Sequence, residues 1–292
     1  MTSEGTVPNS VPDFGGYGLF SLFAAQDTRQ QADLAAEVEE LGYQTLWVGN
    51  STVEQAMPLL GATQRMVVAT AIQSIWRLSA GETSCRHDAM ESAYPGRFAL
   101  GLGVSHPQAS ADYRRPYSAM VQYLDALDAE PEKMPPQRRI LAALGPRMLR
   151  LARDRTAGAL PYLVTAEQVA AARRALGSGP VLAPELGVVV ESDPERARNL
   201  AREAVAFYLG LTNYRKSWLR AGFTEDDMSN GGSDRLIDAL FAWGDDDEIV
   251  ARIQSFREAG ADHVALQVFD GSGPGRVPHY GWRRVAELLS LH

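Results

Sequence analysis

Hydrophobic side chains recur along this chain in one order: an amphipathic stretch, a glycine, and a short apolar run. Leu34, Val38 and Leu41 fall on one face of a predicted helix, Gly42 ends it, and residues 45–48 form a run typical of a buried strand. The unit recurs clearly twice. A predicted helix over residues 148–155 is followed by an apolar run over 159–164, and a predicted helix over 249–256 is followed by a run over 263–269.

Several helix starts carry a capping signal. Thr28 and Gln31 have the spacing of a capping box, and Asp193 with the proline after it indicates an N-cap for a helix reaching about residue 209. The acidic run 245–248 precedes a helix, so we interpret it as a complement to the helix dipole and not as a catalytic carboxylate cluster.

Eight apolar runs are predicted strands, and nearly all of them lack the alternation of a half-exposed strand. They are residues 17–23, 45–48, 66–72, 98–102, 140–144, 159–164, 186–190 and 263–269. Strands covered on both faces are parallel strands with crossover helices, which is an α/β fold. Eight such units in 292 residues predict a (β/α)8 TIM barrel and not a doubly wound sheet.

The repeating order of amphipathic helix, glycine and apolar run also predicts the domain limits. Residues 1–13 have no hydrophobic period and are a predicted flexible N-terminal tail, whereas residues 14–292 are a predicted single barrel domain. Stretches 105–134 and 213–243 are longer βα connections, which lie on the catalytic face of such barrels. Candidates for a substrate-pocket wall, or alternatively for core packing, are Tyr113, Tyr117, Tyr208, Tyr214 and Trp218.

Composition excludes several classes of protein. The net charge of -8 disfavours a nucleic-acid partner, and no run is apolar enough to span a membrane. One cysteine, Cys85, cannot form an internal disulfide, and the start lacks a secretory signal, so we expect a cytoplasmic protein. The five histidines have no ligand spacing, and no metal site is predicted. Motifs of the common serine hydrolases and P-loop NTPases do not occur.

The run Gly-Leu-Gly-Val-Ser-His-Pro over residues 101–107 ends the fourth predicted strand. A third glycine is missing and Pro107 stands where a helix would begin, which argues against a dinucleotide fingerprint. The glycines would let a flat ring lie against the backbone, beside the polar groups of Ser105 and His106. The alternative is a tight strand exit with a surface histidine.

A second candidate is Gly145-Pro146-Arg147, where a strand ends and a helix begins. Free backbone N–H groups and the helix dipole favour a phosphate there, and Arg147 adds a charge-assisted contact. The alternative is an ordinary turn with a solvated arginine. A third candidate, Thr70 at the end of the third strand, either faces the barrel mouth or is a simple strand former.

Taken together, these segments resemble the luciferase-like monooxygenase superfamily, and within it the oxidoreductases that depend on coenzyme F420. The resemblance covers nearly the whole chain, and the order and spacing of its pieces carry it. These pieces are residues 41–43, 46–49, 68–70, 95–98, 100–107, 144–149, 161–165, 231–236 and 259–264.

The resemblance implies a barrel of the bacterial-luciferase-like type, usually a homodimer, with coenzyme F420 or alternatively FMN across the strand carboxyl ends. In many relatives a non-proline cis peptide backs the ring. The implied cofactor-binding residues are Thr70, Ala71 and Ile72 behind the ring, Gly103, Val104, Ser105 and His106 at the ring or ribityl chain, Leu144, Gly145, Pro146 and Arg147 at the phosphate, and Pro161, Tyr162, Leu163 and Thr165 in the neighbouring wall.

One departure from the relatives concerns proton transfer. Several carry an acid and a histidine after the second strand, where this chain has Asn50, Ser51 and Thr52. His106 is the nearby side chain with a suitable pKa for acid–base work, so it is the candidate catalytic residue.

The leading hypothesis is hydride transfer between coenzyme F420 and a small organic substrate. One alternative is an FMN-dependent luciferase-like monooxygenase, because the same barrel serves both cofactors. Another is a non-catalytic deazaflavin-binding protein, which the missing acid and histidine would favour.

Overall fold

The computed structural model describes residues 10–23, 26–108, 110, 112–131, 134–273 and 275–291. Its strands are β1 (Tyr17–Ser21), β2 (Thr45–Gly49), β3 (Val67–Ala71), β4 (Gln73–Ser74), β5 (Phe98–Gly103), β6 (Arg139–Leu141), β7 (Gly158–Ala159), β8 (Val181–Leu182), β9 (Glu185–Val189), β10 (Phe241–Ala242) and β11 (Val264–Phe269). Its helices are α1 (Thr28–Glu40), α2 (Val53–Gly61), α3 (Ala80–Ala93), α4 (Pro116–Ala129), α5 (Pro146–Arg155), α6 (Ala166–Leu176), α7 (Pro194–Leu209), α8 (Thr212–Arg220), α9 (Asp234–Leu240), α10 (Asp246–Glu258) and α11 (His279–Leu288), with short 3-10 helices η1 (Pro136–Arg138) and η2 (Asp226–Met228).

The strands run parallel and curl into a closed barrel. Their order is β10-β9-β11-β1-β2-β3-β5-β6-β7-β8. One segment, residues 181–189, closes the curl, because it carries β8 beside β7 and β9 beside β11. Glu185 N donates to Pro161 O at 2.8 Å on one side, and Ala265 N donates to Pro184 O at 2.9 Å on the other. The predicted α/β barrel is confirmed.

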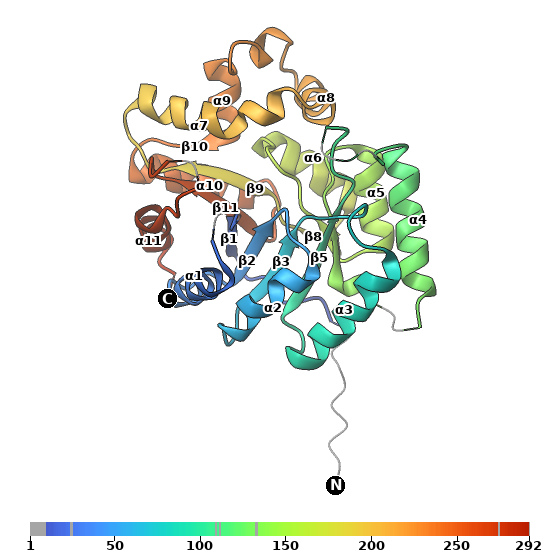
Figure 1. Ribbon diagram of the computed structural model, residues 1–292. Coiled ribbons are helices and arrows are strands. Elements are labelled where there is room, and N and C mark those ends of the chain that lie inside the picture. The colour runs from blue at the N-terminus through green and yellow to red at the C-terminus, as the bar shows by residue number, and fades with distance from the viewer. Residues whose placement is uncertain are drawn as a thin grey trace.

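Apolar residues sort into three layers. Alternate strand residues such as Trp47 point into the barrel, while their neighbours, such as Leu46 and Val48, pack beneath the surrounding helices. A third apolar cluster lies among α7, α8 and α9. Figure 1 shows these three helices as a layer, gold to orange, above the end of the barrel to which the strands point. We call this layer the lobe.

The amino end of the barrel is closed by the chain's own start. Phe14 stacks on Trp47 at a centroid distance of 5.3 Å. The Trp47 indole donates to His263 Nε2 at 2.9 Å, and His263 Nδ1 lies 3.0 Å from Gly15 O. Burial lowers the pKa of His263 to about 4, so the imidazole is neutral and both of its nitrogens are paired. The barrel therefore begins before β1; of the predicted tail, residues 1–9 lie outside the described residues.

The predicted start of α1 was wrong by one residue. The capping box joins Asp27 and Gln30, not Thr28 and Gln31: Gln30 N donates to Asp27 Oδ1 at 2.9 Å, and Asp27 N donates to Gln30 Oε1 at 3.0 Å. A carboxylate accepts from the free N–H groups and also complements the helix dipole, which favours Asp27 over the threonine after it.

The other predicted helix starts are confirmed. The Asp193 carboxylate accepts from Arg196 N at the start of α7, and Pro194 is the first helical residue. Asp245 and Glu248 form a capping box at the start of α10, so the acidic run does complement that helix.

The predicted strand over residues 159–164 was too long, because β7 covers only Gly158–Ala159. Leu163 adopts a left-handed backbone with a φ of 52°, and Thr165 caps α6 two residues later. Each predicted strand overlaps one in the structure, with bounds that differ by one to several residues, and several end earlier than the apolar run. Of the two predicted long connections, 105–134 contains α4, and 213–243 contains most of α8, η2, α9 and β10. None of the described helices is long and apolar enough to cross a bilayer.

Candidate functional site

The exits of β3 and β5 lie side by side at the carboxyl end of the barrel, which we call the mouth. The peptide bond between Ala71 and Ile72 is cis, at the position that the family resemblance implies. Ile72 lies over Gly103, because a Cβ on that glycine would stand 2.7 Å from Ile72 Cδ1. A Cβ on Gly101 would collide with the carbonyl oxygen of Thr70. Because Gly101 and Gly103 have no side chains, they leave room for Thr70 and Ile72. Ile72 presents the surface that a ring would meet.

Thr70 holds the two strands together instead of lining the mouth. Its side chain is buried, and its hydroxyl donates to Gly101 O at 2.8 Å. Val104 is also engaged through its backbone, because its carbonyl accepts from the Trp76 indole at 2.7 Å. Ser105 follows with a left-handed φ of 60° and turns the chain toward His106.

His106 lies where the exit of β5 meets the lobe. Its ring is 5.7 Å from that of Tyr214 and 6.4 Å from that of Phe207, and its side chain hydrogen-bonds to that of Asn213. His106 Nδ1 is buried and has no partner among the described residues. Burial lowers the pKa of His106, so the imidazole is neutral at pH 7 and retains one nitrogen for a ligand.

Two arginines lie near the amino end of α5, each with a different contact. Gly145 is its N-cap and Pro146 its first residue, so the next N–H groups are free of helical partners. The Arg147 guanidinium lies 4.0 Å from the centroid of the Tyr117 ring. Arg220 Nη2 donates to Leu144 O at 2.9 Å, beside the N-cap. A helix amino end favours an anion, and the Arg220 guanidinium lies beside this one.

Among the four residues predicted for the cofactor wall after β7, Tyr162 is the one whose ring lies inside the mouth. Its ring lies 5.3 Å from that of Phe20 and 5.2 Å from that of Tyr208. Its hydroxyl donates to Gln267 Oε1 at 2.8 Å.

The neighbours of Tyr162 have structural contacts. The carbonyl of Pro161 accepts from β9, as described above. Leu163 packs in the core of the lobe, where its N–H donates to Glu185 Oε2 and its carbonyl accepts from the Trp218 indole, each at 3.0 Å. Thr165 uses its side chain to cap α6.

Sequence reasoning missed two polar residues inside the barrel, Glu185 on β9 and Gln267 on β11. Glu185 is buried, and its Oε1 has no partner in the described part of the chain. Burial raises the pKa of Glu185 to about 8, so the carboxyl group is protonated at neutral pH. Each is a lone polar side chain in an apolar strand, which is a signal that the sequence contained.

Arg220 and Phe207 were missed without such a signal, because only the fold of the lobe brings them to the mouth. Phe207 is 58% exposed although it is aromatic. Of the aromatic residues predicted either for a pocket wall or for core packing, Tyr214 and Trp218 pack in the lobe core.

The mouth also contains a cavity that the sequence did not predict. It has a volume of about 280 Å³ and lies between the carboxyl ends of β1 and β11 and helix α7. None of the predicted cofactor-binding residues lines it.

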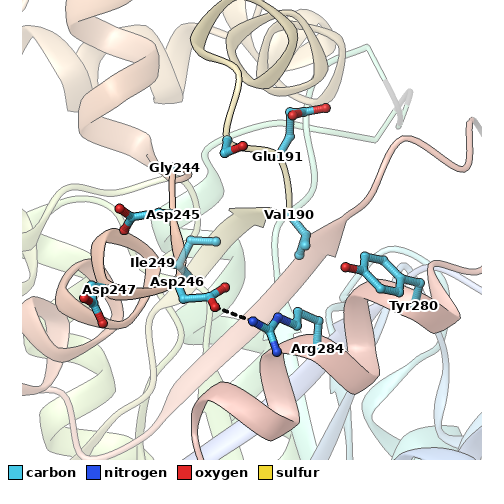
Figure 2. A pocket seen from close by; sticks show the side chains of 10 residues that line it. Val190, Glu191, Gly244, Asp245, Asp246, Asp247, Ile249, Tyr280 and Arg284 are labelled. Carbon is cyan, nitrogen blue, oxygen red and sulfur yellow. Dashed lines mark hydrogen bonds and ion pairs between the residues drawn. The ribbon is translucent and has the colours of Figure 1, made fainter.

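A second hollow, of about 600 Å³, lies at the carboxyl ends of β9 and β10 (Figure 2). Acidic side chains dominate its lining, and its arginine, Arg284, is already paired with Asp246 and Glu287. None of the predicted site residues lies there. No group of three or more His, Cys, Asp or Glu side chains in the described ranges is placed to hold a metal ion.

The fold is a parallel α/β barrel whose strand exits and lobe form a mouth at the carboxyl end. The family model described as luciferase-like monooxygenase matches residues 13–130 and 123–263. The chain therefore belongs to the luciferase-like monooxygenase family and is an oxidoreductase.

Solved structures of similar fold include three whose ligands or cofactors are known. An F420-dependent secondary alcohol dehydrogenase in complex with an F420-acetone adduct is 13% identical with a TM-score of 0.73, covering 94% of this chain and 98% of that one. The coenzyme F420 dependent tetrahydromethanopterin reductase from Methanopyrus kandleri is 15% identical with a TM-score of 0.70, covering 97% and 100%.

The third is the oxygenating constituent of 3,6-diketocamphane monooxygenase from Pseudomonas putida in complex with FMN, 14% identical with a TM-score of 0.64, covering 94% and 96%. At these identities the likeness shows the fold. No curated protein matches the chain in sequence.

Proposed function

We propose that this protein is a coenzyme F420-dependent oxidoreductase that transfers a hydride to or from a small organic substrate. The observation that carries the proposal is the free amino end of α5, where Arg147 is the second helical residue and Arg220 donates to Leu144 O beside the N-cap. Two of the similar structures named above are F420-dependent enzymes, which supports a deazaflavin as the occupant.

The residues at the mouth fit such a cofactor. Ile72 would back the ring, residues 103–106 would run along its edge, and the spare nitrogen of His106 would hydrogen-bond to it. Arg147, Arg220 and the free N–H groups of α5 would hold the phosphate. When bound, the cofactor would supply the hydride chemistry, and the chain would orient it at the mouth.

His106 is the group that we propose for proton transfer. Its imidazole is neutral at pH 7, because burial lowers its pKa, so it is able to accept a proton. Residues 50–52, after β2, offer no such group: Ser51, for example, donates its hydroxyl to Val48 O at 2.6 Å.

A parallel titration of the purified protein with coenzyme F420 and with FMN, followed by fluorescence, tests the proposal. We expect F420 to bind at micromolar concentration and more tightly than FMN. Arg147→Ala should weaken this binding about tenfold or more, as the loss of a charge-assisted hydrogen bond predicts. Arg150→Ala, on the same helix and exposed, should leave it unchanged. Binding of neither cofactor would refute the proposal.

The alternative function is an FMN-dependent monooxygenase, which the FMN complex among the similar structures favours. Tighter binding of FMN, with oxygen consumption by the reduced protein and a substrate, would select it. A non-catalytic deazaflavin-binding protein would bind F420 tightly but exchange no hydride with any of a broad panel of carbonyl compounds and alcohols.

A further inference from the structure

The cavity between β1, β11 and α7 lies in the same mouth as the proposed cofactor site, but its lining comes from other elements. Phe20 and Gln267, which point into the barrel, contribute to this lining. Its volume of about 280 Å³ equals that of roughly nine water molecules in the liquid. The cavity therefore suits a compact organic molecule and excludes a second large cofactor.

Gln267 gives this cavity one fixed hydrogen-bond donor. Its Oε1 accepts from the Tyr162 hydroxyl at 2.8 Å. Burial raises the pKa of Tyr162 well above its usual value, so this hydroxyl keeps the proton that it donates to Gln267. The amide is thereby oriented with Nε2 as its free end, and no acceptor among the described residues takes a hydrogen bond from Nε2.

The rest of the lining is mainly apolar and carries no excess of positive charge. Phe20, Leu22, Leu200 and Phe269 supply hydrophobic surface, and Leu22 is 51% exposed although it is a leucine. The charged members of the lining are two carboxylates and one guanidinium, Glu203, Asp270 and Arg276. The cavity thus combines an apolar wall, one amide donor from Gln267 and no surplus of positive charge. These features favour a neutral ligand that accepts one hydrogen bond.

We propose that this cavity is the substrate site and that it takes a small neutral carbonyl compound or alcohol whose oxygen binds Gln267 Nε2. Tyr162 is the positioning residue that fixes the amide. The role of this ligand as a substrate rests on the proposed function, but its binding does not require the cofactor.

Three ring compounds of similar size test the proposal by NMR titration without cofactor. Cyclohexanone offers an acceptor oxygen, methylenecyclohexane replaces that oxygen by carbon, and cyclohexanecarboxylate adds a negative charge. We expect cyclohexanone to bind about fivefold more tightly than methylenecyclohexane, as one neutral hydrogen bond predicts, and the carboxylate to bind least.

Variants assign the preference to the amide. Gln267→Met, similar in shape but without the donor, should bind cyclohexanone and methylenecyclohexane equally, whereas Gln64→Met, at an exposed position, should keep the preference. Tyr162→Phe should reduce the preference for cyclohexanone about twofold, because the amide of Gln267 is then free to rotate. This variant tests the claim if Gln267→Met does not fold.

Other outcomes would overturn the proposal. Binding of none of the three compounds, equal binding of ketone and alkene by the natural protein, tightest binding of the carboxylate, or an unchanged preference in folded Gln267→Met would each do so. Because no cofactor is present, these results judge the substrate site alone, whereas the F420 and FMN titrations judge the proposed function.

Discussion

Two sets of buried polar side chains, one at each end of the barrel, differ in their hydrogen bonding. At the amino end, Trp47 and His263 are buried and fully paired, with Phe14 stacked beneath them. At the mouth, His106 Nδ1 and Glu185 Oε1 are buried without partners in the described part of the chain. Unpaired buried polar groups are costly and rare in native proteins. His87 Nε2 in α3 and Arg139 Nε at the start of β6 are unpaired as well among the residues that the structure describes, so such atoms are not confined to the mouth. We expect the paired Trp47 and His263 to stabilise the fold, and we propose that the unpaired atoms at the mouth meet a ligand.

Both ends also hold a titratable group that burial keeps neutral. Burial lowers the pKa of His263 and raises the pKa of Glu185. The imidazole has a protein partner on each nitrogen, but the carboxyl group has one oxygen to spare. Neutrality is therefore common to both groups, and the spare carboxyl oxygen of Glu185 is what separates them.

The largest effect is expected at the amino end. Trp47→Ala should lower the free energy of unfolding by about 3–5 kcal/mol, because it empties the barrel floor and leaves His263 without a donor. Urea denaturation measures this loss. Phe207→Ala at the mouth, where the ring is mostly exposed, should cost less than about 1 kcal/mol. Equal losses would remove the distinction between the two ends.

Glu185→Gln should change how stability depends on pH. The folded protein keeps the Glu185 proton up to a pKa of about 8, whereas the unfolded chain releases it near 4.5. Ionisation therefore favours the unfolded state, and this side chain should lower stability as the pH rises from about 5 to 8. Glutamine does not titrate, so its free energy of unfolding should not fall in this way. Relative to the natural protein, the free energy of unfolding of the variant should therefore rise by on the order of 3 kcal/mol between about pH 5 and 8. Parallel pH-dependent curves for the two proteins would contradict the buried neutral carboxyl.

Arg220→Ala should act on ligand binding and not on the barrel floor. We expect the affinity for coenzyme F420 to fall about tenfold to a hundredfold, as the loss of one charge-assisted contact predicts. Calorimetry of both proteins measures the change. Lys216→Ala, on the same helix, is the control. An unchanged affinity would exclude Arg220 from the phosphate site.

The smallest effect concerns an ordinary polar group near the mouth. Asp27→Ala should destabilise the protein by about 1 kcal/mol, because α1 loses its N-cap, whereas Thr28→Ala should cost much less. Thermal unfolding compares the two variants. Neither should change cofactor affinity, since both capping partners of Asp27 are satisfied within α1.

The apolar runs were sufficient to predict the barrel because buried parallel strands need continuous hydrophobic sequence. They did not show how the barrel closes, since β8 and β9 belong to one segment and are separated only by residues 183 and 184. Local motifs predicted the helix start at Pro146 correctly. Asp27 and Thr28 are adjacent polar residues, and either could accept from the free N–H groups of α1. The sequence did not show that Asp27 would be the N-cap.

The candidate site was predictable only where it is local in sequence. The exit of β5 and the start of α5 carry recognisable glycine and proline signals. Arg220, in contrast, reaches Leu144 from 76 residues away, and nothing in its own neighbourhood indicates that contact. Glu185 and Gln267 were visible as lone polar residues in apolar strands, but their direction into the barrel required the register of the sheet.

The most direct test of the mouth as the cofactor site is amide hydrogen exchange with and without saturating coenzyme F420. The account predicts slower exchange at residues 103–108 and 144–150 on binding, with no change at residues 14–16 and 263–265 at the amino end. Protection confined to the amino end, or to the hollow at Glu191 and Asp245, would contradict it.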